Sequence, residues 1–436
     1  MMHLISVTCV SVGWFLLANI LLLSLGCSQE KAKKANPLHY LSSNNQQYTN
    51  ASADYVIKFP QVHAPQTSYQ QEWWYLTANL TTEQGQSLAS QWTLFRRAVG
   101  NKHWYFAHAA LADANEHQSA YRNGRIALGN VSMNTEPFNA TIDDWQWQSS
   151  AALLPASLRY GSAVGSIPVT APSITTPSEI SSHSANIDLA SLNQTSMNQT
   201  AINQTTIKNQ PTSNHPKTTT KTITKTTTKT TTKTTAKSKT NNDWQVELEL
   251  TSNEDFFLQG DNGYSRKHPT LDIASHYYSQ PFIDVTGQVF WQGQWQKVTG
   301  KAWFDREWAS QMLAPDQQGW DWFSLRLDDD KALMVFRLRS SDTDYFYASI
   351  MERGGAIRSI ANHDIVLISS VSASSKTNQY PNQFSLTIAK EAIDIKVQVV
   401  NEQQIMRFGI EYFEGMVTFD GSHNGQGFVE MTGYDK

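Results

Sequence analysis

The sequence predicts an all-β protein of many antiparallel strands, arranged as a sandwich or a barrel. Apolar and polar residues alternate with a period of two in a series of short segments, which is typical of half-buried strands. These segments are VELELTS (246–252), GQVFWQG (287–293), FSLRLDDD (323–330), LMVFRLRS (333–340), FSLTIA (384–389) and IDIKVQVV (393–400). Turn-forming stretches such as QGDNGY, WQGQW and LDDDK separate them, as expected for hairpins. No long amphipathic helix pattern and no phosphate-binding glycine loop breaks the series, which favours closed or stacked β-sheets.

Composition narrows the class of protein further. The chain has 436 residues, with 34 Lys and Arg against 38 Asp and Glu, so it lacks the basic excess of nucleic-acid-binding proteins. Its 14 tryptophans fall in short clusters with Gly, Asp and Tyr, which suits a β protein whose aromatic rings line a cavity. We therefore expect a hydrophobic small molecule or lipid as partner, and no nucleic acid.

The N-terminus is typical of an export signal. Residues 1–26 contain no charged side chain, and the apolar run ends in SLGC, which resembles a lipoprotein cleavage site. We predict a signal peptide over 1–26, lipidation of Cys27 and a polar tether over 27–53. An uncleaved membrane anchor is the alternative, because about 20 apolar residues can span a bilayer. Both interpretations place the body in the cell envelope, and Ser28 after the cysteine favours the outer membrane facing the periplasm.

A low-complexity segment interrupts the first half of the chain. Residues 162–241 consist mainly of Ser, Thr, Asn, Gln and Lys, with the repeats SLNQT-SMNQT-AINQT and KTTT-KTIT-KTTT. So little apolar surface cannot offset the entropy of ordering, so we predict a disordered insert. It separates ASLRYG from DWQVELEL, which we expect to be neighbouring strands joined across a long loop. The insert is either a basic arm for anionic polymers or an expanded loop without a role.

Several aromatic and acidic motifs occur in a fixed order outside the insert. They are QEWWYLTANL, TLFRRA, FAHAALAD, LQGDNGYSRK, ASHYYSQPF, GKAWFDREW, GWDWFSLRLDDDKALMVFRLR, YFEGMVTFDG and EMTGYDK. Together they resemble the hydroxyneurosporene synthase (carotenoid 1,2-hydratase) and AttH-like family, whose members are often labelled predicted secreted hydrolases. The resemblance covers residues 54–434 apart from the insert. It implies two packed lipocalin-like antiparallel β-barrel domains, 54–280 with the insert and 281–436.

The resemblance leaves two functions open. One branch of the family hydrates a carotenoid double bond, related fungal proteins shape a cyclisation, and many exported members have no assigned reaction. The first hypothesis is a lipid-anchored protein that binds or passes a hydrophobic, lipidic or isoprenoid ligand, with an ABC transporter as a candidate partner. The second is a hydratase or hydrolase that acts on such a molecule by acid–base chemistry. The two differ in whether the candidate catalytic residues converge on a cavity.

Strand alternation divides the charges of AWFDREW (302–308) between two faces. Asp305 and Glu307 share one face with Trp303, whereas Arg306 lies on the other. A buried charge needs a partner, and we predict two structural ion pairs, one in each barrel. They are Glu72 with Arg96 and Arg306 with Asp321.

The remaining polar residues are candidates for chemistry and binding. Water addition or hydrolysis requires a general acid and a base at one apolar cavity, and we assign these roles to Asp305, Glu307 and His108. His108 also fits a hydrogen-bonded core histidine. The candidate ligand-binding residues are the aromatic ones near these motifs: Trp73, Tyr75, Tyr264, Tyr277, Trp303, Trp320 and Trp322. The histidines have no recognisable metal spacing, and we expect no metal and no cofactor.

Overall fold

The computed structural model describes residues 41, 47–162, 243–373, 375 and 379–434. The predicted signal peptide, Cys27, most of the tether and residues 163–241 of the predicted insert lie outside these ranges. Within the described ranges, no helix has both the length and the apolar character to cross a bilayer.

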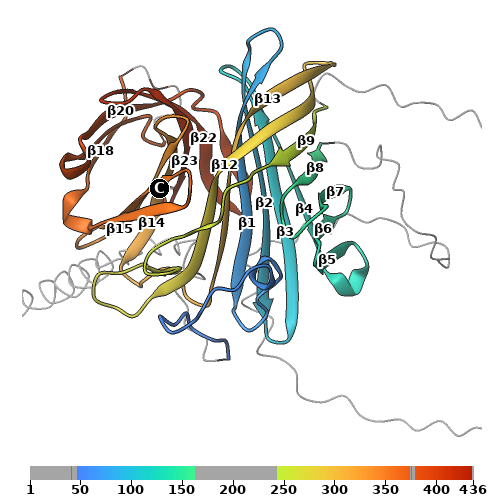
Figure 1. The fold of residues 1–436 in the computed structure, drawn as a ribbon, viewed down its shortest axis with the longest axis horizontal. Helices are drawn as coiled ribbons and strands as arrows, with labels where there is room; N and C mark the ends of the chain where they lie inside the picture. Colours follow the sequence, from blue (N-terminus) through green and yellow to red (C-terminus); the bar gives the residue numbers. More distant parts are fainter. Residues whose placement is uncertain (1–40, 42–46, 163–242, 374, 376–378, 435–436) are drawn as a thin grey trace, which may run out of the picture. The chain divides into compact units, whose positions relative to one another are not determined.

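The first half of the chain forms a 13-stranded antiparallel sheet with the order β4-β3-β2-β1-β13-β12-β9-β8-β7-β6-β5 (Figure 1). Short strands β10 and β11 pair with β12 beside this path. The strands are β1 (Gln71–Thr82), β2 (Ser87–Val99), β3 (Lys102–Ala112), β4 (His117–Gly124), β5 (Val131–Thr135), β6 (Phe138–Ile142), β7 (Trp145–Ser149), β8 (Ala156–Gly161), β9 (Gln245–Thr251), β10 (Phe257–Leu258), β11 (Tyr264–Arg266), β12 (Ala274–Trp291) and β13 (Gln294–Ala309). Strands β8 and β9 pair directly, so the long segment between them does connect neighbouring strands.

The second half forms a 10-stranded antiparallel sheet with the order β17-β16-β15-β14-β23-β22-β20-β19-β18, and β21 pairs only with β22. Its strands are β14 (Gln317–Arg326), β15 (Lys331–Ser340), β16 (Tyr345–Glu352), β17 (Ala356–Ile360), β18 (Val366–Ser370), β19 (Gln383–Ile388), β20 (Ile393–Val399), β21 (Ile405–Phe408), β22 (Ile410–Gly421) and β23 (Gly425–Thr432). Single 3₁₀ turns lie at η1 (Gln61–His63), η2 (Ile126–Leu128), η4 (Asn362–Asp364) and η5 (Ala389–Glu391).

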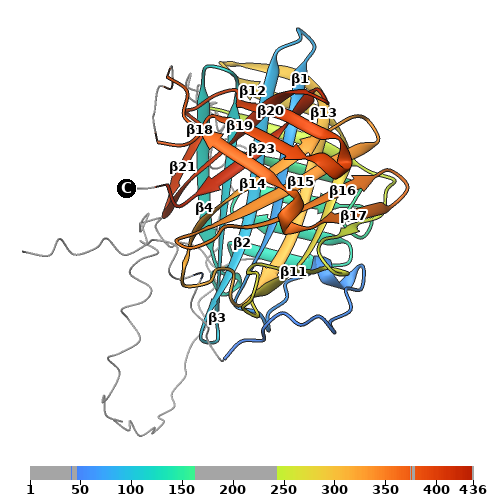
Figure 2. The same cartoon turned by 90° about the vertical axis from the view of Figure 1, so that its left-hand side faces the viewer.

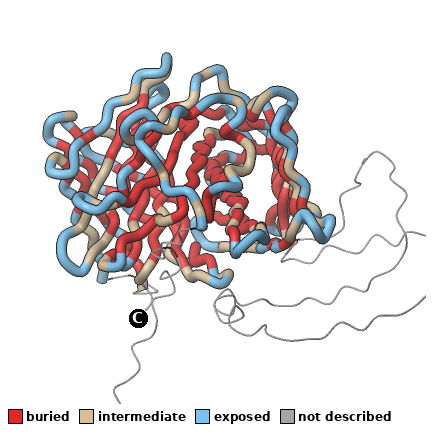
Figure 3. The backbone as a smooth tube through the Cα atoms, turned by 90° about the horizontal axis from the view of Figure 1, so that it is seen from below, coloured by how far each residue is buried: buried red, intermediate tan, exposed pale blue. Residues whose placement is uncertain are grey.

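Each sheet curls around its own hydrophobic core. In the first, the rings of Trp74 and Phe138 stack at 6.1 Å, joining β1 to β6 across the curl. In the second, the rings of Phe323 and Phe384 meet at 5.0 Å, joining β14 to β19. Side chains therefore fill both curled sheets, and Figure 3 shows buried residues along the strands and exposed ones mainly in the turns. The predicted two-barrel, all-β architecture is confirmed.

The boundary that we predicted between residues 280 and 281 is wrong. It falls inside β12, which continues to Trp291 and pairs with β9 and β13. The pairing of β12 with β13 shifts register between Gln280 and Ile283, at Pro281. Proline lacks the N–H that a ladder needs and is typical of bulges, so this sequence signal marks a bulge and not a domain junction. The first barrel ends at Ala309 and the second begins at Gln317.

A third apolar cluster lies between the two barrels. It joins outward-facing residues of the first barrel, such as Tyr75 and Trp303, to residues of the second, such as Trp322 and Met416. Figure 2 shows strands of the second barrel in front of β1 and β2 of the first. The barrels are thus packed face against face, and the candidate site lies in this interface.

One of the predicted ion pairs has a different partner. Glu72 contacts Arg96, as predicted, but its second oxygen contacts Arg306, and all three side chains are fully buried. Arg306 belongs to the first barrel because β13 does, and its neighbour in the register of β1 is Trp74. Asp321 in the second barrel is instead paired with two other arginines, Arg337 at 3.7 Å and Arg339 at 3.3 Å. Each barrel therefore buries one carboxylate between two arginines.

Candidate functional site

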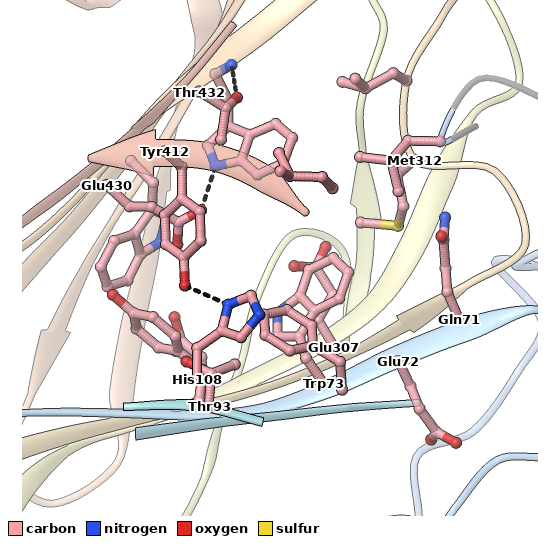
Figure 4. Close-up of a pocket in the computed structure, with 18 of the residues that line it drawn as sticks. Gln71, Glu72, Trp73, Thr93, His108, Glu307, Met312, Tyr412, Glu430 and Thr432 are labelled. Atoms are coloured by element: carbon pink, nitrogen blue, oxygen red, sulfur yellow. Dashed lines mark hydrogen bonds between the residues drawn. The ribbon is translucent and has the colours of Figure 1, made fainter. Parts of the chain in front are cut away.

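A cavity of about 150 Å³ lies between the two barrels. Strands β1, β2, β3, β12 and β13 line it from the first barrel, and β14, β15, β21, β22 and β23 line it from the second. Its lining is mostly aromatic and aliphatic, but five residues with a carboxyl group belong to it: Glu72, Asp305, Glu307, Glu414 and Glu430. Glu72 is the one already paired with Arg96 and Arg306. Figure 4 shows polar side chains from both barrels directed toward this space.

Two rows of side chains on the outer face of the first barrel build one wall. Each row runs across five neighbouring strands through residues that are directly opposite each other. On every strand the two rows are two residues apart, so the side chains of both rows point to the same side of the sheet. One row is His108, Thr93, Tyr75, Asp305 and Ser279, and the other is Phe106, Phe95, Trp73, Glu307 and Tyr277. The row between them carries Arg306 and points into the barrel core. The predicted division of AWFDREW into two faces is therefore what the structure shows.

Asp305 accepts hydrogen bonds at both of its oxygens. Ser279 and Trp303 donate to Oδ1 at 2.5 and 2.8 Å, and the Tyr277 hydroxyl donates to Oδ2 at 2.7 Å. Trp322 of the second barrel donates in turn to the Tyr277 hydroxyl at 3.2 Å. Burial raises the pKa of Asp305 to about 7, although these donors act in the opposite direction. Such a group can change its protonation state near neutral pH.

Glu414 and Glu430 lie directly opposite each other on β22 and β23. Tyr75 donates a hydrogen bond to Glu414 Oε1, and Trp320 donates to Glu430 Oε1 at 2.9 Å. Glu414 Oε2 is buried and has no hydrogen-bond partner among the described residues. Burial and the neighbouring Glu430 raise the pKa of Glu414 well above its ordinary value, and burial raises the pKa of Glu430 to about 7. Two adjacent carboxyl groups at low polarity cannot both ionise, so the pair holds a proton.

Glu307 has a positively charged partner and differs in this respect from Asp305, Glu414 and Glu430. Lys267 lies 2.6 Å from its Oε1, and Ser275 donates a hydrogen bond to the same oxygen. The Lys267 ammonium also lies 4.6 Å from the centre of the Phe336 ring and 5.3 Å from that of Tyr277. Glu307 and Lys267 thus form a buried ion pair within the site.

His108 bridges the two barrels. Its Nδ1 lies 2.9 Å from the hydroxyl of Tyr412 on β22, and Figure 4 shows this contact across the cavity. Burial lowers the pKa of His108 to about 3, so the ring is neutral at physiological pH. A neutral imidazole beside a tyrosine positions that tyrosine and is a poor proton donor.

The structure brings most of the predicted site residues to one cavity. Asp305, Glu307 and His108 line it, together with Trp73, Tyr75, Tyr277, Trp320 and Trp322. Trp303 lies behind the wall and reaches the site through its bond to Asp305. Tyr264 does not line the cavity, and its hydroxyl donates to Asp272 at 2.7 Å. The physical reason is that Tyr264 lies on β11, which pairs with the edge of β12 away from the cavity wall.

Sequence reasoning missed Glu414, Glu430, Lys267 and Tyr412. A signal was present, because Glu414 alternates with Tyr412 and Met416, and Glu430 with Phe428 and Thr432, on otherwise apolar strand faces. A glutamate on such a face is costly unless it is paired or protonated. What the sequence could not show is that the two glutamates are opposite each other, because that depends on the register of β22 with β23.

Fold and site together define a double-barrel protein of lipocalin-like architecture with an acidic, aromatic cavity at the barrel interface. The chain belongs to the AttH-like family, whose model matches residues 50–171 and 168–434. This confirms the family resemblance of the sequence motifs. No curated protein matches the chain.

Solved structures share the fold over nearly the whole chain. An AttH protein from Nitrosomonas europaea is 25% identical, with a TM-score of 0.63, covering 89% of this chain and all of its own. Kievitone hydratase from Nectria haematococca is 12% identical, with a TM-score of 0.53, covering 90% of this chain and 97% of its own. At this low identity, the second likeness concerns the fold alone.

Proposed function

We propose that this protein is an acid–base enzyme that adds water to a carbon–carbon double bond at the apolar end of an isoprenoid-type molecule. The observation that carries the proposal is Glu414, a carboxyl group in an aromatic cavity that lies opposite Glu430 and has one oxygen without a partner among the described residues. An ionised oxygen buried without a partner is costly, so this oxygen carries a proton. A protonated carboxyl beside apolar walls can act as a general acid toward an alkene.

The proposed reaction begins with proton transfer from Glu414. The π electrons of the double bond form the new C–H bond, and a cation develops on the neighbouring carbon. The faces of Tyr75, Trp73, Trp320 and Trp322 surround this space, and aromatic faces stabilise a cation by about 0.5–2 kcal/mol each. The ionised form of Asp305 adds an opposite charge.

Water then completes the addition. An oxygen lone pair of water attacks the cation, and the released proton passes to Asp305. One proton has now moved from Glu414 to Asp305, and it must return before the next turnover. Tyr75 is suited to this return, because its hydroxyl donates to Glu414 and its backbone position lies directly opposite Asp305.

The other predicted catalytic residues have supporting roles in this proposal. The buried Lys267–Glu307 pair fixes Ser275 and the adjacent strand. His108 orients Tyr412 from across the interface. We assign neither residue a proton transfer to the substrate.

The proposal is tested with farnesol as substrate in water enriched in oxygen-18. The expected product of the wild-type protein is farnesol to which one hydrogen and one labelled hydroxyl group have been added. The rate of its formation should fall about 100-fold or more in Glu414→Gln and in Asp305→Asn, because general acids and bases contribute about 10²–10⁴ to the rate. Tryptophan fluorescence quenching measures binding independently, because three tryptophans line the cavity. Binding without any labelled product would overturn the hydration proposal.

That outcome would support the second candidate, a non-catalytic carrier of hydrophobic ligands. The observation that favours it is the aromatic lining of the cavity, which suits the binding of an apolar molecule. The acidic cavity favours chemistry over carriage.

We also propose that the protein is exported and anchored to the outer membrane through lipidated Cys27, with an ABC transporter as a candidate partner in the envelope. The support is the sequence SLGCS at residues 24–28. Fatty-acid labelling of the wild type, lost in Cys27→Ala, is the expected result. Labelling that persists in this variant would contradict the anchor.

A further inference from the structure

The cavity between the barrels is too small to hold an isoprenoid chain. Its volume is about 150 Å³, and an apolar protein cavity of this volume binds a molecule of about the size of benzene. A ligand longer than one isoprene unit must therefore leave the cavity at some point of its wall. We call this space the inner cavity.

A second hollow adjoins the inner cavity at Phe408. It is an open groove of about 440 Å³ lined by His117 and Ser119 on β4, by Ile405, Arg407 and Phe408 on β21, and by Gln403. We call it the outer groove. Phe408 lines both spaces, so the inner cavity and the outer groove meet at this residue. Figure 2 shows β21 and β4 together at the same margin of the molecule.

Phe408 lies at the end of a strand that is held on one side only. Strand β21 pairs with β22 and with no other described strand. Gly409 joins β21 to β22 with a φ of 77°, a left-handed conformation that glycine adopts without strain. The ring of Phe408 is half-buried, and its centre lies 5.2 Å from the centre of the His108 ring and 5.1 Å from that of Tyr121. A ring in this place can turn aside without breaking a sheet.

The outer groove differs chemically from the inner cavity. Its lining offers the amide of Gln403, the hydroxyl of Ser119, the imidazole of His117 and the guanidinium of Arg407. His117 Nε2 is buried and has no hydrogen-bond partner among the described residues. Arg407 is paired with Glu411 at 3.1 Å, but 60% of its side chain is exposed. Among the described residues that line the groove there is no carboxylate, and Arg407 is the one charged side chain, with Glu411 beside the groove as its countercharge.

From these observations we infer that the outer groove binds the anionic or hydrogen-bonding polar end of the ligand, while the apolar end passes Phe408 into the inner cavity. The ligand class is thus an amphiphile with a carboxylate or similar polar head and an isoprenoid tail. Arg407 selects the head group, and Phe408 defines the passage. The inference rests on the apolar ligand proposed above for the inner cavity, and does not depend on the hydration step.

Three probes with the same tail test the head-group site: farnesene, farnesol and farnesoic acid. Their dissociation constants are measured by tryptophan fluorescence on the full chain. We expect farnesoic acid to bind about fivefold more tightly than farnesol, because an exposed ion pair contributes ~1 kcal/mol and this energy corresponds to a fivefold change in the dissociation constant. Arg407→Gln should remove this preference, so that farnesoic acid and farnesol bind equally tightly to the variant.

Arg358→Gln is the matched control, because Arg358 is also an exposed arginine paired with a glutamate, Glu391 at 2.6 Å, on the far strand β17. It should keep the preference for the acid. Phe408→Trp, which enlarges the ring where the two spaces meet, should weaken farnesol binding several-fold and weaken the binding of the five-carbon prenol less.

The outcomes separate the two proposals. Equal binding of farnesoic acid and farnesol by the wild type, or a preference that survives in Arg407→Gln, overturns the outer-groove site while the inner cavity stands. If prenol and farnesol both fail to bind, the apolar ligand of the inner cavity is itself wrong.

Discussion

Glu414 and Glu430 face each other directly across two antiparallel strands in a cavity with mostly apolar walls. Like charges at opposed positions destabilise a sheet, so this arrangement is compatible with folding only if the pair retains a proton. The same arrangement supplies a proton donor beside an apolar space. The same pair of glutamates therefore destabilises the fold when it is ionised and provides a proton donor for catalysis.

The first prediction concerns this pair and pH. Burial raises the folded-state pKa of Glu430 to about 7, whereas the unfolded value is near 4.5. The proton is held more tightly in the folded state, so its contribution to stability is present below pH 4.5 and is lost as the pH rises through 7. Glu430→Gln removes this loss, and its melting temperature should exceed that of the wild type increasingly between pH 5 and pH 8.

Thermal melts of both proteins at unit steps of pH measure this difference. Glu83→Gln, at an exposed glutamate with only a distant lysine partner at 3.8 Å, is the control and should follow the wild type. A difference in melting temperature between the wild type and Glu430→Gln that narrows as the pH rises would show that the pair is ionised in the folded protein.

The second prediction concerns the buried charges of the first barrel. Two arginines flank Glu72, and together they lower its pKa even though burial alone would raise it. Glu72→Gln leaves Arg96 and Arg306 as buried cations without a carboxylate. Breaking a buried ion pair costs about 3–5 kcal/mol, so urea denaturation should show a loss of that size in the free energy of unfolding.

Asp321→Asn provides the parallel test in the second barrel. It removes the carboxylate between Arg337 and Arg339, but those arginines are 20% and 12% exposed, whereas Arg96 and Arg306 are fully buried. The loss should therefore be smaller than for Glu72→Gln. The reverse order would mean that burial does not decide the cost of these charges.

The third prediction separates folding from ligand handling on the strand AWFDREW. Asp305→Asn removes a charge that faces the inner cavity, whereas Arg306→Ala removes one that faces the barrel core and leaves Glu72 with Arg96 as its remaining arginine. We expect Asp305→Asn to melt within a few degrees of the wild type and Arg306→Ala to melt much lower. A stable Arg306→Ala beside an unfolded Asp305→Asn would reverse the assignment of the two faces.

The fourth prediction concerns the segment between β8 and β9. The strands pair up to Gly161 and Gln245, and the backbone of Ser162 donates to Trp244 at 3.0 Å. An Asn-Gly turn in place of residues 163–243 leaves two residues between the facing Ser162 and Trp244, as a two-residue hairpin requires. The shortened protein should fold with a melting temperature within about 2 °C of the full chain, because closure entropy changes only slowly with loop length.

Farnesol binding by the shortened protein completes that test, since the described lining of the inner cavity comes from the rest of the chain. A loss of several degrees, or of binding, would show that the segment contributes to the barrels.

The sequence by itself determined the strand content, the sorting of side chains between strand faces and the family. These properties are local: alternation with a period of two fixes that Asp305 and Arg306 point to opposite sides wherever the strand lies. For the same reason the sequence placed Trp73, Tyr75 and Asp305 on wall-facing positions. It also predicted that Glu72 and Arg96 meet, because β1 and β2 are consecutive strands of one hairpin.

Only the tertiary structure decided which distant strands lie side by side. Strand β13 pairs with β1, although more than 200 residues of chain separate them. This pairing brings Arg306 into contact with Glu72 and places Asp305 opposite Tyr75. The packing of the two barrels then adds Glu414 and Glu430 to the same cavity. Register between distant strands depends on the free energy of the whole assembled sheet, and no periodicity within one strand carries that information.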